Sequence, residues 1–283
     1  AGSVPLVSNA GVLRTARDHG ITTVQAACEY DDNSLDAGAD TIVTTVEENG
    51  DYLRIITEDD GSGIPPEVET ETGERVDGIA HVLSFGGRID APGTRIGRFG
   101  WGLSASSTCQ SLETHVYSRV KGEERYRHIE LNLEELQESG SVDIGPSEVT
   151  NLPEHIEEQL PEKDSGTFVV LEKVDDSDFK TPSRMAAELK KEFSTRYRRF
   201  IDAGRTIIVN GEKLKPRDPL YTMKNCFNQR GIPRESGCTS HAITPGSGLI
   251  GGRRRFTDRR TRSARLERRR SPLRYQRGRR ENA

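Results

Sequence analysis

The stretch EYDDNSLDAGAD, residues 29–40, sets several carboxylates and one asparagine inside a segment with the pattern of an amphipathic helix. We predict this helix over residues 22–37, because Thr22 and Gln25 form a capping-box pattern and Gly38 follows where a C-terminal glycine is typical. Residues three, four and seven positions apart share one face of a helix. That face therefore carries Glu29, Asp32, Asn33 and Asp36. Taken alone, a polar face of this kind is usually just turned to solvent.

Strand signals follow this helix along the chain. Residues 40–60 alternate apolar and polar side chains around an Asn-Gly-Asp turn, which predicts a β-hairpin, and residues 205–216 predict a second Asn-Gly hairpin. Two further strands are predicted at 113–120 and 125–133. The β-branched run at 166–174 predicts a central strand.

Helices are predicted between these strands. Helical spacing appears at 75–85, a helix start at 103–111 and a long helix at 182–202, while residues 134–165 form an acidic connector. Consecutive strand pairs with inserted helices indicate an α+β fold, with helices layered on one face of a mixed, mostly antiparallel sheet.

The composition favours a cytoplasmic protein without a membrane partner. Of the 283 residues, 32% are hydrophobic and 30% charged, and no apolar run is long enough for a membrane span or a secretory signal. The cysteines have no zinc-type spacing, so we expect buried or idle thiols. They are Cys28, Cys109, Cys226 and Cys238.

Charge is distributed unevenly along the chain. Residues 223–283 hold 17 of the 41 lysines and arginines but 4 of the 45 acidic residues. The acidic remainder is compatible with simple solubility, and we favour a halophilic source, in which salt screens the self-repulsion of the acidic residues. The arginine-rich segment lacks aliphatic periodicity, so we predict disorder there. Two interpretations stay open for it: an arm that binds nucleic acid phosphates, or a solvated tail.

Three glycine-containing motifs change the interpretation of the polar helix face. Asp59, Gly61 and Gly63 end a predicted strand with a carboxylate, which can accept a hydrogen bond from an exocyclic amine, and with glycines that let backbone approach a flat ring. The segment IGRFGWG, residues 96–102, opens onto a helix and can present backbone N–H groups to phosphates. A Gly-Thr pair, residues 166–167, begins a late strand. Neither a Walker nor a Rossmann glycine pattern occurs.

In this order, the motifs resemble the GHKL family of ATP-binding domains, which includes gyrase B, the ninety-kilodalton heat-shock chaperone, sensor histidine kinases and MutL. The family pattern E-x-x-x-N-[SA]-x-D-A is matched by Glu29, Asn33, Ser34, Asp36 and Ala37. The segments VLSFGG and IGRFGWGLSAS look most like the MORC and heat-shock-chaperone branches. A kinase-type phosphoacceptor histidine and the MutL lid motif are missing, which disfavours those two branches.

The resemblance implies a two-layer Bergerat-type sandwich and a role for each matched residue. Glu29 would be the general base that deprotonates the attacking water. Asn33 would ligate Mg²⁺, and Asp36 would hold the surrounding loop. Asp59 would receive the adenine amino group, with Gly61, Gly63 and Thr167 around it. A lid would close over the triphosphate through Gly97, Arg98, Phe99, Gly100 and Gly102. Two interpretations stay open for Arg95 and Arg98: contacts to phosphate, or solvated arginines on the lid.

We expect three regions: an ATP-binding domain at 1–175, a connecting helix and the beginning of a truncated transducer-like domain at 176–222, and the arginine-rich tail at 223–283. Lys213 and Lys215 are more typical of a solvated hairpin edge than of the lysine that the transducer domain supplies in such ATPases. The leading hypothesis is a Mg²⁺-dependent ATPase whose ATP-bound lid promotes homodimerisation. The alternatives are a catalytically silent nucleotide-binding module and a protein that binds nucleic acid through its basic tail.

Overall fold

The computed structural model describes residues 15, 17–18, 20–87, 102–140, 143–156, 158–161, 163–220 and 222–223. All of them belong to one compact unit, Ala1–Gly237. The second unit, Cys238–Ala283, lies outside the described residues, as does the predicted arginine-rich tail after Met223. The predicted disorder of that tail therefore stays a prediction.

The first predicted helix is confirmed as α2 (Thr23–Asp36). Its N-cap Thr22 accepts a hydrogen bond from the backbone of Gln25, whose side chain in turn accepts from the Thr22 backbone, which completes the capping box. Gly38 follows the helix with a φ of +78°, a value that glycine adopts without strain. Local sequence thus fixes both ends of the helix that carries the conspicuous polar face.

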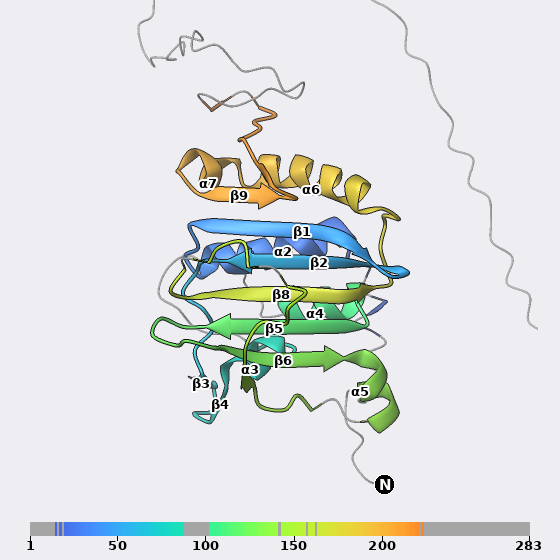
Figure 1. Cartoon of the computed structure of the whole chain (residues 1–283), viewed down its shortest axis with the longest axis vertical. Coiled ribbons are helices and arrows are strands. Elements are labelled where there is room, and N and C mark those ends of the chain that lie inside the picture. Colours follow the sequence, from blue (N-terminus) through green and yellow to red (C-terminus); the bar gives the residue numbers. More distant parts are fainter. Residues whose placement is uncertain are drawn as a thin grey trace, which may run out of the picture. The chain divides into compact units, whose positions relative to one another are not determined.

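The described residues form an eight-stranded sheet in the order β10-β9-β1-β2-β8-β5-β6-β7 and a separate two-stranded sheet, β3-β4 (Figure 1). Neighbouring strands of the large sheet are antiparallel except for β1 and β9. The strands are β1 (Thr41–Asn49), β2 (Tyr52–Asp59), β3 (Glu67–Glu69), β4 (Arg75–Asp77), β5 (Glu113–Arg119), β6 (Tyr126–Asn132), β7 (Glu148–Thr150), β8 (Gly166–Val174), β9 (Thr206–Val209) and β10 (Glu212–Lys213). The predicted central strand is confirmed, because β8 lies between β2 and β5.

Helices cover one face of this sheet, as predicted, and α2 and α4 lie behind the strands in Figure 1. The main core fills the space between the layers with side chains from both, including Tyr30, Ile55, Leu171 and Phe193. The helices after α2 are α3 (Gly78–Leu83), α4 (Gly102–Gln110), α5 (Leu133–Ser139), α6 (Pro182–Arg196) and α7 (Arg198–Asp202). The α+β two-layer architecture is therefore confirmed.

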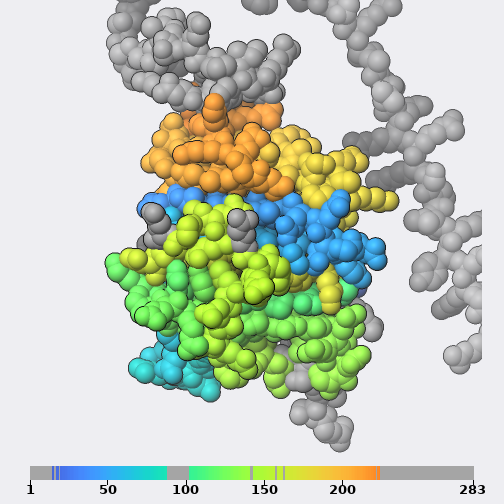
Figure 2. Space-filling model, in the orientation of Figure 1, coloured from blue at the N-terminus to red at the C-terminus, as the bar shows by residue number. Residues whose placement is uncertain are grey.

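The opposite sheet face is covered in part by the connector between β7 and β8, drawn in yellow-green over the strands in Figure 2. Ile156 of this connector joins a second apolar cluster with Tyr126 and Phe168. A buried ion pair links the same segments, with 2.7 Å between Lys163 Nζ and Glu58 Oε1 and at most 3% of either side chain exposed. The Glu58 carboxylate also accepts two backbone N–H groups of the connector, which satisfies its buried charge.

Three details differ from the predicted elements. The helix predicted at 75–85 begins only at Gly78, because Arg75–Asp77 pair with β3 as strand β4. The acidic connector contains α5 and the short edge strand β7, and the predicted long helix at 182–202 is divided at Tyr197 into α6 and α7. Tyr197 is buried and donates a hydrogen bond from Oη to the carbonyl of Cys28 on α2, so packing against α2 fixes the position of the break.

Residues 176–222 pack onto the first 175. β9 pairs in parallel with β1, and α6 packs against α2 and β1. The domain boundary at residue 175 stays a prediction. None of the helices among the described residues has both the length and the apolar character that crossing a membrane requires.

Candidate nucleotide site

Asp59 is the last residue of β2 and is buried beneath the end of α2. Its Oδ2 accepts a hydrogen bond from Ser34 Oγ at 2.9 Å, and its Oδ1 accepts from the backbone N–H of Gly61 at 2.8 Å. Burial raises the pKa of Asp59, while these two hydrogen bonds and the charge of Lys163 oppose the shift. A carboxylate has four lone pairs, so Asp59 can accept a further donor such as an exocyclic amine.

Gly61 and Gly63, which follow Asp59, are needed because other backbone segments lie very close to them. Gly63 has a φ of +72°, and a Cβ on it would overlap the backbone carbonyl of Arg119 at the end of β5. A Cβ on Gly61 would come 2.9 Å from both the Ala37 Cβ and Asp59 Oδ1. Both glycines thus let the loop after β2 fit between α2 and the strand ends.

Thr167 lies directly beside Asp59, because the two residues are register partners in β8 and β2. Its Oγ1 is 3.0 Å from Ser118 Oγ, and Ser118 also accepts the backbone N–H of Ile64 at 2.7 Å. Gly166 has a φ of +150°, and a Cβ on it would overlap the Asp59 carbonyl. The Gly-Thr pair therefore brings a hydroxyl to the strand end that carries Asp59.

Glu29 is half-buried on α2 and faces the first residue of α4. A Cβ on Gly102 would overlap the Glu29 carboxylate oxygen Oε2, so the carboxylate occupies the place that a side chain would take. Within the described part of the chain, the Glu29 carboxylate receives no hydrogen bond. Because Gly102 begins α4, the Glu29 carboxylate lies next to a helix N-terminus, where backbone N–H groups attract phosphate.

The electrostatic surroundings of Glu29 come from α2 and α6. Burial raises the pKa of the Glu29 carboxyl, the negative charge of Asp32 adds to this rise, and Arg196 of α6 opposes it. Asp32 is buried and forms an ion pair with Arg196, at 2.5 Å between Oδ2 and Nη2. The adjacent Asp31 is fully buried against Thr44, and its pKa is raised well above the usual range by desolvation.

The predicted polar face of α2 is therefore not uniform. Asn33 is exposed one turn after Glu29, and Asp36 is half-buried near the end of the helix, whereas Asp32 points into the protein and pairs with α6. A side-chain amide presented to solvent beside a carboxylate offers a neutral oxygen to a hard cation. The donor set at Asn33 fits Mg²⁺, which takes most of its ligands from water and phosphates.

Part of the predicted lid lies outside the described residues. Of its members, Gly102 is described and begins α4, whereas Arg95, Gly97, Arg98, Phe99 and Gly100 are not described. The predicted contacts of these five residues with the triphosphate therefore stay predictions. What the structure does establish is that α4 packs beside α2, with small residues such as Ser106 and Ser107 buried between them.

The arrangement agrees with a comparison to protein families. The family described as "Histidine kinase-, DNA gyrase B-, and HSP90-like ATPase" matches residues 21–167, slightly more than half of the chain. This chain belongs to that family. The match begins just before α2 and ends at Thr167, so it includes all of the motifs above. No curated protein matches the sequence.

Membership of this ATPase family implies that the chain binds ATP. The structure brings Asp59 and Thr167 together at one strand end, and Glu29 and Gly102 together at the α2–α4 contact. Sequence reasoning missed the contributions of Ser34, Ser118 and Arg196 to this ATPase site. Of these three residues, Ser34 alone belongs to the family pattern and could have been assigned a role from the sequence. Ser118 and Arg196 reach the site through tertiary contacts.

Proposed function

We propose that this chain hydrolyses ATP in a Mg²⁺-dependent reaction with Glu29 as the general base. The observation that carries the proposal is the contact between the Glu29 carboxylate and the first residue of α4. A γ-phosphate bound at the α4 N-terminus would lie beside this carboxylate, and a water molecule between them would be in line for attack.

Glu29 acts on the attacking water. Its carboxylate accepts a proton as the water oxygen bonds to the γ-phosphorus, and the bond from phosphorus to the bridging β–γ oxygen breaks, leaving ADP and inorganic phosphate. A base is more effective as its pKa approaches the working pH, so burial and Asp32, which both raise the pKa of Glu29, favour this role. Such a base typically contributes about 10²- to 10⁴-fold to the rate.

Asp59 binds the adenine in this proposal. Its carboxylate is held by Ser34 and Gly61 and lies beside Thr167, so an exocyclic amine would find an acceptor with its orientation already fixed. Gly63 lets the loop after Asp59 pack directly against the backbone of Arg119 at the end of β5.

Asn33 would hold Mg²⁺ through its amide oxygen. When bound, the ion would supply positive charge that offsets the negative charge of the phosphates. Asp36 would support the α2–β1 loop, and the backbone N–H groups of the lid, with Arg98, would meet the remaining negative charge. Lys213 is exposed on the edge strand β10, which supports its interpretation as a solvated residue.

Phosphate release by the purified chain and by Glu29→Gln tests the proposal. We expect hydrolysis by the parent to fall at least about 10²-fold in Glu29→Gln, while affinity for Mg²⁺-ATP is retained. Glu135→Gln is the matched control, because Glu135 is an exposed glutamate on α5, and it should leave the rate unchanged. Equal rates for the parent and Glu29→Gln would refute Glu29 as the base. ATP binding without any hydrolysis by the parent would favour a catalytically silent module.

Three broader proposals accompany this one. The lid motif supports assignment to the MORC-like and heat-shock-chaperone-like branch and ATP-dependent homodimerisation, which sedimentation with and without a nonhydrolysable ATP analogue would test. Cys28 and Cys109 are buried free thiols, which supports a reducing, cytoplasmic location. Nucleic acid binding by the tail is the remaining alternative, and deletion of residues 223–283 should then abolish binding and its salt dependence.

A further inference from the structure

β5 and β6 present a group of polar side chains on the sheet face that the helices do not cover. Val116 of β5 and Ile129 of β6 belong to the core beneath the helices. Because successive residues of a strand point to opposite faces, the residues at odd positions of β5 and at even positions of β6 point the other way. This set comprises Glu113, His115, Tyr117 and Arg119 of β5, and Tyr126, His128, Glu130 and Asn132 of β6.

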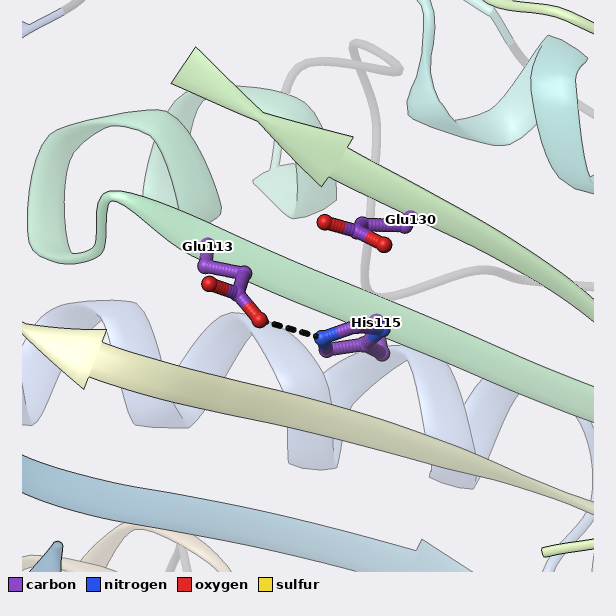
Figure 3. A group of neighbouring side chains, drawn as sticks. All are labelled: Glu113, His115 and Glu130. Carbon is purple, nitrogen blue, oxygen red and sulfur yellow. Dashed lines mark hydrogen bonds and ion pairs between the residues drawn. The ribbon is translucent and has the colours of Figure 1, made fainter. Parts of the chain in front are cut away.

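Strand register brings three of these side chains together. His115 is the direct cross-strand partner of Glu130, and Glu113 precedes His115 by two positions on the same face. One ligand atom from each of the three residues lies within 4.8 Å of the others. Figure 3 shows the Glu113 carboxylate directed at the His115 ring, at 3.0 Å from Nε2, with Glu130 across from them on β6.

The His115 ring is held in one orientation by a contact at Nδ1, the ring nitrogen that faces away from Glu113. His115 Nδ1 lies 3.0 Å from His128 Nε2, and the His128 ring stacks on Tyr117 with 4.3 Å between centroids. Histidines that bind metals through one nitrogen commonly donate the other N–H to a neighbouring acceptor, which fixes the tautomer and the ring plane. His128 can supply that acceptor, which leaves Nε2 of His115 to face the two carboxylates.

We propose that Glu113, His115 and Glu130 bind a transition-metal dication, with Zn²⁺ as the best match. One imidazole nitrogen and two carboxylate oxygens are ligands of the type that Zn²⁺ takes in tetrahedral sites with an open fourth position. Bond lengths near 2.1 Å place tetrahedral ligand atoms about 3.4 Å apart, so small side-chain rotations suffice to close the group around an ion. Mg²⁺ fits less well, because it prefers oxygen ligands alone.

Charge around the group favours a cation. The side chains of His115 and Glu113 are 13% and 19% exposed, so the group is reachable but partly desolvated. Lys173 Nζ lies 2.6 Å from Glu113 Oε2, and Asn132 Nδ2 lies 3.3 Å from Glu130 Oε1. Two carboxylates against one ammonium leave a surplus negative charge for a dication to neutralise. Lys173→Met should therefore tighten metal binding, because it removes the competing positive charge.

The test is calorimetric titration of ZnCl₂ into the full chain. Cys226→Ser and Cys238→Ser are introduced throughout, so that these thiols do not bind zinc. We expect one Zn²⁺ to bind per chain. Affinity should be at least about tenfold lower in His115→Gln and in Glu130→Gln, which alters an exposed side chain. His155→Gln is the matched control, because His155 Nε2 contacts a single carboxylate, that of Glu172, at 3.0 Å, and its binding should equal that of the parent.

The titrations distinguish Zn²⁺ binding by Glu113, His115 and Glu130 from Zn²⁺ binding elsewhere on the chain. The absence of saturable Zn²⁺ binding by the folded parent would overturn the proposal. So would undiminished binding in both His115→Gln and Glu130→Gln, with circular dichroism showing an intact fold. An equal loss in His155→Gln would also overturn it, because that variant leaves all three ligands in place.

Discussion

Arg196 of α6 reaches back across the helical layer to Asp32 of α2, with 2.5 Å between Nη2 and Oδ2. Asp32 lies three positions after Glu29. The negative charge of Asp32 raises the pKa of the Glu29 carboxyl, and the positive charge of Arg196 lowers it. Residues beyond the matched family segment therefore influence the electrostatics of the proposed catalytic base. This contact links α6 to the proposed ATP site within the same unit.

The pH dependence of hydrolysis should report this link. A general base works when deprotonated, so activity should fall as pH decreases through the raised pKa of Glu29. Removing positive charge in Arg196→Gln should move this acidic limb to higher pH, and removing negative charge in Asp32→Asn should move it to lower pH. Measured profiles of kcat/KM would show the shifts. Arg198→Gln, which alters an arginine paired with Asp218, is the control and should leave the limb in place. Identical limbs in the Arg196 and Asp32 variants would contradict the link.

Gly102→Ala should separate stability from turnover. The added Cβ overlaps the end of the Glu29 side chain, which can rotate away without disturbing the backbone. Alanine also favours a helix over glycine by up to about 1 kcal/mol. We therefore expect an unchanged or higher Tm but a rate reduced by up to about 10²-fold, because the base is displaced. Gly145→Ala serves as the control, since a Cβ at Gly145 meets open space. Full activity in Gly102→Ala would argue against the position of the base.

Lys163→Met should destabilise the fold. It leaves the Glu58 carboxylate buried without its cationic partner, and breaking such a pair typically costs about 3–5 kcal/mol. The control Lys121→Met breaks an exposed pair with Asp164, where a change of at most about 1 kcal/mol is expected. Urea unfolding of both variants gives the comparison. A similar loss of unfolding free energy in the two variants would show that the connector does not depend on the buried pair.

The parts of the fold that local interactions determine could be predicted from the sequence. The capping box of Thr22 and Gln25 depends on neighbouring residues alone, whereas the Asn-Gly turn at Asn210, which has a φ of +46°, is also held by hydrogen bonds to Val46 of β1. The β-branched run of β8 predicted a central strand, and the structure confirms it, because most of this strand is buried. The position proposed for the ATP site comes from ordered motifs that the structure places at strand ends and a helix start.

Other features depend on contacts between distant segments. Asp32 appeared to share a solvent face with Glu29, yet its partner Arg196 is 164 positions away in the chain. The three-residue strand β7 gains its order from pairing with β6, and its own sequence carries little strand signal. The proximity of His115 and Glu130 likewise depends on the register of β5 and β6, which the two segments do not reveal separately.

The most direct test of the account is calorimetric titration of a nonhydrolysable Mg²⁺-ATP analogue into the full chain and into Asp59→Asn. Asparagine keeps the size of the side chain but puts an amide NH₂ in place of one carboxylate oxygen that would accept the adenine amine. We predict saturable binding to the parent and a loss of at least about tenfold in the variant, in line with removal of a hydrogen bond to a charged group. Equal affinity of the two folded proteins would contradict the assignment of Asp59. No binding to the folded parent would contradict the central claim that this chain is a nucleotide-binding protein.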